Sequence, residues 1–234
     1  MRNAGRALRW IGMMLLASAV TAAEPVTEKP LRQQPHLIGH RGLVSHAPEN
    51  TLAAFAACID LRVGFELDIR RTRDGHLVCL HDDDVKRTTS GTGKVADLTL
   101  TELRKLDAGR WFDPAFAGEK VPTLEEVFLL LKGKQATPVH VALDFKIDDS
   151  TVAADVVRLA KTHGILDRVI CIGLAIEGPA VRRKLREADA ESPAAVLAQK
   201  AEDLPAALAD RDSDWVYVRF IPTAEQVVDR KSVV

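Results

Sequence analysis

The chain of 234 residues contains 47% hydrophobic residues, enough for a sizeable core in one large domain or two small ones. Its 32 basic and 33 acidic residues give a formal net charge of −1. This balance provides neither the basic surface that nucleic acid requires nor a strong acidic field, so we expect a small-molecule substrate and no nucleic-acid partner.

The first 23 residues have the layout of a secretory signal peptide. A start with three arginines is followed by an apolar run over residues 10–20 and then by small residues. The run is short for a bilayer span, although an N-terminal membrane anchor is the alternative. We therefore expect export, to a periplasm or to the medium, with no stable membrane span after signal cleavage. Residues 24–34 are expected to form a polar linker.

Export raises the question of disulfides. Cys58, Cys79 and Cys171 are odd in number and lack the paired spacing of a disulfide framework or a zinc site. Each lies in an apolar run, so we expect buried free thiols that pack as small hydrophobic groups.

Beyond the linker, short apolar segments rich in β-branched residues alternate with amphipathic ones. The expected strands are Leu37–Gly39, Gly64–Arg70, Val139–Phe145, Val169–Leu174, Ala194–Leu197 and Trp215–Phe220. Thr99, Thr123 and Thr223 each open a Thr-x-x-Glu/Gln helix-capping signal, and a further amphipathic helix follows Thr51. Alternating strands and helices predict a parallel sheet, open or closed into a barrel.

An Asp-Gly pair at residues 74–75 interrupts this alternation between two strand-like segments, which is a strong signal for a hairpin. Such a hairpin returns His81 toward Glu66 and Asp68. These two carboxylates share one face of their strand, because side chains alternate along it. Imidazoles transfer protons near neutral pH, paired acids hold a hard cation, and an arginine grips phosphate. The residue types therefore indicate metal-assisted chemistry on a phosphate ester.

A series of short motifs runs in order along the chain. They are His40-Arg41-Gly42, Pro48-Glu49-Asn50-Thr51, Glu66-x-Asp68, Thr72-x-Asp74-Gly75, Val78-x-x-His81-Asp82, Leu106-Asp107-Ala108-Gly109, Val121-Pro122-Thr123-Leu124-Glu125-Glu126 and Asp144-Phe145-Lys146. Together they resemble the signature of the glycerophosphodiester phosphodiesterases. The resemblance runs from about residue 37 to residue 146 and more loosely to residue 220.

This resemblance implies an α/β fold, a TIM-type (β/α)8 barrel with its site at the C-terminal ends of the strands. It also implies a divalent cation, Ca²⁺ or Mg²⁺, and hydrolysis of a glycerophosphodiester to glycerol 3-phosphate and an alcohol. By motif position, the catalytic acid–base pair is His40 and His81, the substrate contacts are Arg41 and Lys146, and the metal ligands are Glu66, Asp68 and Asp144.

Asp144 departs from the family pattern, which has glutamate at this position. The ligand arm is shorter by one methylene, so we expect a changed metal affinity or metal choice, or a bridging water. For the reaction we hypothesise that a hydroxyl of the substrate's own glycerol attacks first and that water then opens the cyclic phosphate.

Plainer alternatives exist for several of these residues. The acids of the Glu66-x-Asp68 motif have Arg70 and Arg71 as alternative ion-pair partners, and Asp144 has Lys146. The remaining sets are expected to be structural: His46 and His140 as surface or packing residues, residues 82–84 as a solvated acidic loop, and Trp111 and Phe112 as core or groove residues.

Two alternative functions also remain. One is a phosphodiesterase of lysophospholipids or phosphoinositides on the same barrel, and the other is a non-catalytic phosphate-binding module. The presence of both His40 and His81 argues against the module, because binding alone needs no pair of proton carriers. We expect the domain to cover residues 35–228 and to be truncated before its last two strands, with residues 229–234 as a candidate non-native tail. The sequence leaves the oligomeric state open.

Overall fold

The computed structural model describes residues 37–134, 139–148, 151–173, 178–210, 213–220, 223 and 232–233. The chain divides into two units, residues 1–34 and 35–234, and all described residues belong to the second. The predicted signal peptide and linker, and Gln226 of the third capping signal, lie outside the described residues. Among the described helices, none is both long and apolar enough to span a bilayer.

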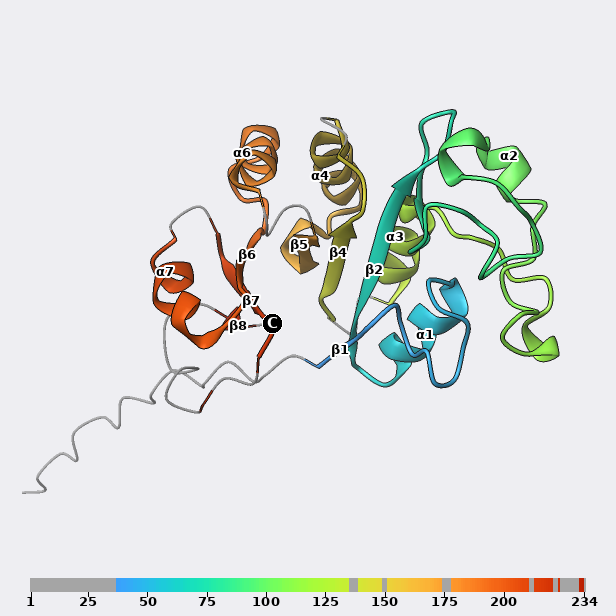
Figure 1. Ribbon diagram of the computed structural model, residues 1–234, viewed down its shortest axis with the longest axis horizontal. Coiled ribbons are helices and arrows are strands. Elements are labelled where there is room, and N and C mark those ends of the chain that lie inside the picture. Colours follow the sequence, from blue (N-terminus) through green and yellow to red (C-terminus); the bar gives the residue numbers. More distant parts are fainter. Residues whose placement is uncertain are drawn as a thin grey trace, which may run out of the picture. The chain divides into compact units, whose positions relative to one another are not determined.

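The described strands form two sheets (Figure 1). In the first, β1 (Ile38–Gly39), β2 (Gly64–Arg71), β4 (Val141–Phe145) and β5 (Val169–Gly173) lie parallel in that order, and β3 (Leu77–Cys79) pairs antiparallel with β2. In the second, β6 (Ala195–Ala198), β7 (Trp215–Val218) and β8 (Ser232–Val233) are parallel. A parallel bridge between Cys171 and Ala194 connects the two. Within the described residues the strands do not close into a barrel.

Helices follow the strands in the alternation that the sequence predicts. They are α1 (Leu52–Asp60), α2 (Leu100–Leu103), α3 (Leu124–Gly133), α4 (Val152–His163), α6 (Pro179–Ala188) and α7 (Leu204–Ala209), with single 3₁₀ turns at Val95–Asp97, Pro114–Phe116, Leu166–Arg168 and Ala201–Asp203. Thr99 and Thr123 form complete capping boxes, and Thr51 caps α1 by accepting a hydrogen bond from the backbone of Ala54. The predicted helix starts are therefore confirmed at these three positions.

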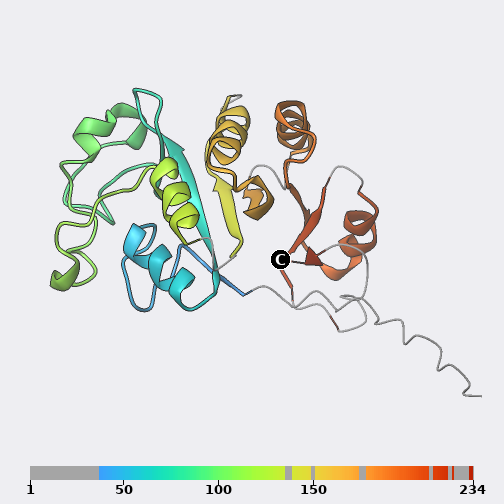
Figure 2. The ribbon, with the colours of Figure 1, turned by 180° about the vertical axis from the view of Figure 1, so that it is seen from behind.

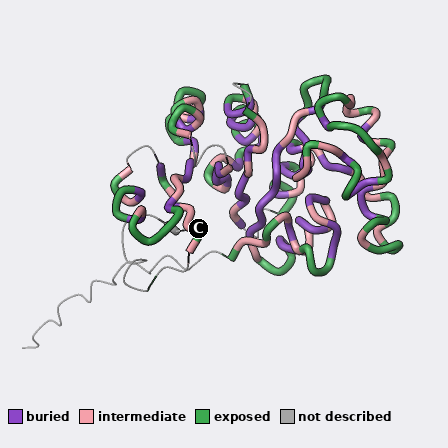
Figure 3. Tube along the Cα trace, viewed as in Figure 1, coloured by how far each residue is buried: buried purple, intermediate pink, exposed green. Residues whose placement is uncertain are grey.

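The strand β2 separates the core from the site. Phe65, Leu67 and Ile69 are fully buried in one apolar cluster with side chains of α1, α3 and α4. Figure 2 shows α1 and α3 in front of β2 on this side of the sheet, and Figure 3 shows how buried residues concentrate along β2 and β4. Because side chains alternate, Glu66 and Asp68 lie on the opposite face.

A second apolar cluster holds the segment after β2. Val78, Leu80 and Val85 pack there with later residues, including Leu103 of α2 and Val121. The predicted hairpin is confirmed, since Ile69 pairs with Cys79 across β2 and β3. The cluster therefore fixes the backbone that leads into His81.

Other predictions were correct in kind and differ at their ends. Five predicted strands have shifted limits, and they are observed at Ile38–Gly39, Gly64–Arg71, Val141–Phe145, Ala195–Ala198 and Trp215–Val218. Leu174, the last residue of the sixth, lies outside the described residues. The three cysteines are free and buried, as predicted. The proposed domain limits stay predictions.

The hairpin turn allows a matched test with two glycines. Gly75 has a φ of +90°, and a Cβ added there meets nothing within 4 Å, whereas Gly133 at the end of α3 has equally open surroundings without a positive φ. Gly75→Ala should therefore lower the free energy of unfolding by about 1 kcal/mol through backbone strain alone. Gly133→Ala should raise it by about 0.5 kcal/mol. Urea unfolding measures both, and a Gly75→Ala variant as stable as the wild type contradicts the turn geometry.

Candidate active site

Three carboxylates converge on the face of the sheet opposite the helices. Asp68 of β2 and Asp144 of β4 are direct partners in the parallel register, and Glu66 lies two residues before Asp68 on the same face. One oxygen from each residue lies within 4.8 Å of the others. Glu66 is 6% exposed and Asp68 is completely buried. The strands thus bring together the three predicted metal ligands.

The cluster fits a hard divalent cation. Carboxylate oxygens are the ligands that Ca²⁺ and Mg²⁺ prefer. The Oδ1 atom of Asp68 is buried and makes no hydrogen bond, and the ammonium of Lys146 lies 3.2 Å from it, so a cation already occupies its surroundings. A Cβ on Gly173 would lie 2.0 Å from Oδ1 of Asp144, so only glycine leaves room for this carboxylate. The residues present therefore suit a bound metal ion.

Crowding of these acids shifts their protonation. Burial, followed by the negative charge of Asp68, raises the pKa of Glu66 to about 8. The hydrogen bond that Glu66 accepts from the backbone N–H of Arg41 acts in the opposite direction but does not outweigh these effects. Without an added positive charge, Glu66 is therefore protonated at neutral pH.

Arg41 reaches the cluster from the loop after β1. Its backbone N–H donates to Oε2 of Glu66 at 2.8 Å, and its Nε lies 3.5 Å from Oδ2 of Asp68. Arg41 has a φ of +57° and Gly42 a φ of +89°, with the Cβ position of Gly42 only 2.7 Å from Cβ of Ala54. This tight turn against α1 directs the guanidinium toward the carboxylates.

His40 lies at the open side of the same cluster. Its side chain is 70% exposed, and Nε2 lies 3.9 Å from Oε2 of Glu66. Partial burial, and then the positive charge of Arg41, lower the pKa of His40. The ring is therefore neutral at pH 7, the state that accepts a proton.

Lys146 binds two of the three acids. Its Nζ donates to Oδ2 of Asp144 at 2.6 Å and lies 3.2 Å from Oδ1 of Asp68. Burial opposes the charged form, but the hydrogen bond and charge of Asp144 outweigh it and raise the pKa of Lys146. The salt bridge between Asp144 and Lys146 considered as an alternative is thus present, within a larger charged cluster.

His81 follows β3, where the hairpin returns the chain. Its Nδ1 lies 2.8 Å from Oδ1 of Asp82, and its carbonyl accepts two hydrogen bonds from Arg70. The positive charge of His81 is a smaller cause of the lowered pKa of His40. The Leu80 N–H donates to the carbonyl of Asp68, so the hairpin brings the backbone of His81 beside β2, and the role of the two rings as an acid–base pair stays a prediction.

Two functional positions escaped the sequence analysis. Asn50 is buried with a φ of +55°, donates from Nδ2 to Oδ2 of Asp68 at 2.7 Å, and accepts from the Asp68 backbone N–H. It holds the Asp68 carboxylate in one orientation. Its motif was recognised, but only the fold shows this contact. Arg87, which binds both Glu49 and Asp82, gave no sequence signal.

Several plainer alternatives are resolved by other contacts. Arg70 donates to the His81 carbonyl, and Arg71 pairs with Asp155 at 2.8 Å. Among the described contacts, Glu66 and Asp68 instead bind Arg41, Asn50 and Lys146. The residues expected to be structural have the following surroundings. His46 is exposed, and His140 packs edge-on against Trp215. Asp84 accepts a hydrogen bond from the backbone of Lys86, and Trp111 is 41% exposed and packs against Phe112.

A family model described as the glycerophosphoryl diester phosphodiesterase family matches residues 40–219. A glycerophosphodiester phosphodiesterase of Caldanaerobacter subterraneus subsp. tengcongensis is 54% identical over 99 residues, which cover 42% of this chain and 41% of that protein. The Bacillus subtilis glycerophosphodiester phosphodiesterase is 36% identical over 137 residues, covering 54% of this chain and 47% of that protein. The chain thus spans less than half the length of these curated relatives.

Solved structures share the fold. The glycerophosphodiester phosphodiesterase of Agrobacterium tumefaciens superposes with a TM-score of 0.67 at 29% identity, over 79% of this chain and 76% of that one. An Oleispira antarctica phosphodiesterase, solved with the product sn-glycerol-3-phosphate, gives a TM-score of 0.64 at 24% identity, over 79% and 74%. These likenesses confirm the predicted α/β barrel class. The chain belongs to the glycerophosphoryl diester phosphodiesterase family.

Proposed function

We propose that the chain hydrolyses glycerophosphodiesters to glycerol 3-phosphate and an alcohol with a divalent metal ion, Ca²⁺ or Mg²⁺. The observation that carries this proposal is the convergence of Glu66, Asp68 and Asp144 beside Arg41 and Lys146, with His40 at the open side. Membership of the family and the names of its relatives support the same substrate class.

The substrate's negative charge determines which groups must surround it. A phosphodiester repels nucleophiles, and positive groups that contact its oxygens remove this repulsion. Arg41 offers a planar fork for these oxygens, and Lys146 offers a point charge. A metal ion bound by the three acids supplies further charge neutralisation as a Lewis acid. In this proposal the cations bind the phosphate while the acids hold the cations in place.

Two proton transfers complete the reaction. A hydroxyl of the substrate's glycerol attacks phosphorus, and its proton passes to a histidine. As the new O–P bond forms, the bond to the head-group oxygen breaks, and the second histidine protonates that oxygen. Water then opens the cyclic phosphate by the reverse use of the pair. The neutral ring of His40 suits the first base. His81 suits the acid when its Nε2 carries a proton, because Asp82 accepts from Nδ1 and the Nε2–H proton passes to the leaving oxygen.

We also propose that the protein is exported, on the signal-like pattern of its first 23 residues. An exported enzyme acts on glycerophosphodiesters that are present outside the cytoplasm. Detection of the mature chain in a periplasmic or culture fraction, with a new N-terminus near Glu24, tests this part of the proposal.

The activity is tested by release of glycerol 3-phosphate from glycerophosphocholine with the full-length protein, with and without chelator. His40→Ala and His81→Ala should each lower kcat by about 10²- to 10⁴-fold, because each removes one proton carrier. His46→Ala, at an exposed histidine bonded to Ser45, should leave the rate unchanged. Rapid quench of the wild type should detect the cyclic phosphate. Absence of product with every divalent metal favours a phosphate-binding module instead.

Metal dependence is tested by stability against pH. The Glu66 carboxyl has a pKa of about 8 in the folded chain and near 4.5 when unfolded. The folded state therefore holds this proton more tightly, so stability of the metal-free protein should fall as pH rises from about 4.5 to about 8. Added Ca²⁺ or Mg²⁺ binds the charged form and should raise Tm most at the upper end.

Glu66→Gln keeps the hydrogen-bond acceptor but removes the ionisable group. We expect it to flatten this part of the pH profile and to abolish the rise in Tm with metal. Glu202→Gln, at a 76% exposed side chain, serves as the control and should keep both the pH dependence of stability and the rise in Tm with metal. Thermal unfolding from pH 4 to pH 9, with and without metal, measures these two quantities. A Glu66→Gln variant that metal still stabilises contradicts the ligand assignment.

A further inference from the structure

A chain of alternating charges leads from the phosphate side of the site to His81. Arg41 donates from Nη1 to Oε1 of Glu49 at 3.1 Å. Glu49 in turn accepts from Arg87, Arg87 also binds Asp82, and Asp82 lies against Nδ1 of His81. The two ends of this network are groups that the proposed reaction uses. Among the contacts of the described residues, those of Glu49, Arg87 and Asp82 do not include the acidic cluster.

Arg87 is the branch point of this network. Its Nη1 and Nη2 donate to the two carboxylate oxygens of Glu49 at 2.9 and 2.8 Å. Its Nε and Nη2 donate to the two oxygens of Asp82 at 2.7 and 3.0 Å. One planar guanidinium therefore grips two carboxylates at once, each by two hydrogen bonds, which the single ammonium of lysine does not reproduce.

The backbone that carries Arg87 is itself fixed. The Val85 N–H donates to the carbonyl of Gly93, and the Thr89 hydroxyl donates to the carbonyl of Val85 at 2.6 Å. Thr88 and Thr89, which follow Arg87 in the chain, are both buried. The Arg87 side chain is 44% exposed, so it remains open to solvent.

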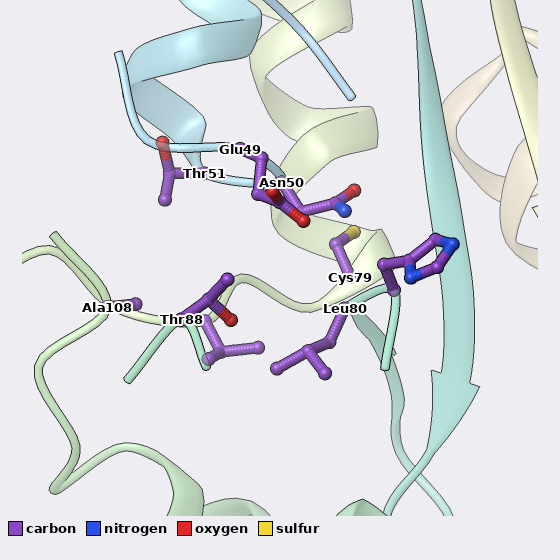
Figure 4. A pocket seen from close by; sticks show the side chains of 9 residues that line it. Glu49, Asn50, Thr51, Cys79, Leu80, Thr88 and Ala108 are labelled. Atoms are coloured by element: carbon purple, nitrogen blue, oxygen red, sulfur yellow. The ribbon is translucent and has the colours of Figure 1, made fainter. Parts of the chain in front are cut away.

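The segments that Arg87 connects also line a small cavity. This cavity, with room for about one water molecule, lies between residues 49–51, residues 79–81 and Thr88. Figure 4 shows Glu49 and Asn50 on one side of it and Leu80 and Thr88 on the other. Asp68 already links the segments, because it binds the side chain of Asn50 and its carbonyl accepts from the Leu80 N–H. The bidentate contacts of Arg87 span the segments on either side of the cavity.

The network also determines which nitrogen of His81 carries a proton. The hydrogen bonds from Arg87 lower the pKa of Asp82, so this carboxylate is ionised and only accepts hydrogen bonds. Nδ1 of His81 must then be the donor, which leaves Nε2 for proton exchange. At the other end, Glu49 holds the guanidinium of Arg41 beside Asp68.

We propose that Arg87 is a positioning residue that holds the imidazole of His81 and the guanidinium of Arg41 in register through Asp82 and Glu49. This inference rests on the proposed function, because it assigns His81 and Arg41 to the reaction. It predicts that loss of Arg87 affects turnover through His81 and substrate binding through Arg41, although Arg87 touches neither.

The test uses Arg87→Ala in the full chain. We expect kcat on glycerophosphocholine to fall about tenfold or more and KM to rise. Because the side chain is partly exposed, added guanidinium ions should restore part of the lost rate, and sodium chloride at equal ionic strength should not. Nitrogen-15 NMR of His81, assigned from the signal lost in His81→Ala, should show a smaller fraction of the Nδ1–H tautomer. Arg73→Ala, which removes the exposed ion pair of Arg73 with Glu102, should change none of these quantities.

Arg87→Lys covers the case in which the alanine variant does not fold. Lysine keeps the positive charge but lacks the planar guanidinium. The tautomer of His81 should therefore shift and the rate should fall, and added guanidinium should restore neither. The proposal is overturned if either folded variant keeps both the wild-type tautomer of His81 and the wild-type rate. It is also overturned if the rate falls, guanidinium does not restore it, and the tautomer of His81 stays unaltered. A wild type without hydrolysis defeats the proposed function instead, and the tautomer measurement then still decides the role of Arg87.

Discussion

Repulsion among three carboxylates, two of them buried, is the constraint on which the rest of the site depends. Glu66 and Asp68 are almost completely removed from water, and Asp144 lies beside them on the neighbouring strand. Burial, and then the negative charge of Asp68, disfavour ionisation here and raise the pKa of Glu66. Positive charge relieves this repulsion. Arg41 and Lys146 supply part of it, and a divalent cation would supply the rest.

The fold imposes this arrangement through the alternation of side chains along β2. Phe65, Leu67 and Ile69 of this strand point into the apolar core beneath the helices. The acids that alternate with them, Glu66 and Asp68, must therefore point to the opposite face of the sheet. Shifting the register by one residue would bury both carboxylates in the core, which explains why strand pairing and site geometry are determined together. The turn after β1 and the hairpin after β2 then bring in the cations and imidazoles.

The parts of this site that the sequence predicts are those that depend on local rules. The Asp-Gly turn, the capping boxes and the i, i+2 spacing of Glu66 and Asp68 each act over a few residues, and each is found in the structure. Strand ends shifted because pairing with neighbours, rather than the apolar pattern, sets where a ladder stops. The contacts of Asn50 with Asp68 and of Arg87 with Glu49 join residues 18 and 38 positions apart. No local signal encodes such pairs, because they depend on the folded positions of separate loops.

A diffraction experiment on crystals soaked with Mn²⁺, a probe with an anomalous signal, tests the central claim most directly. The account predicts one strong anomalous peak within ligand distance of Glu66, Asp68 and Asp144, with Lys146 moved away from Asp68. Two results would contradict it. One is a strong peak elsewhere on the chain, and the other is the absence of any fully occupied metal site while these carboxylates keep their present contacts.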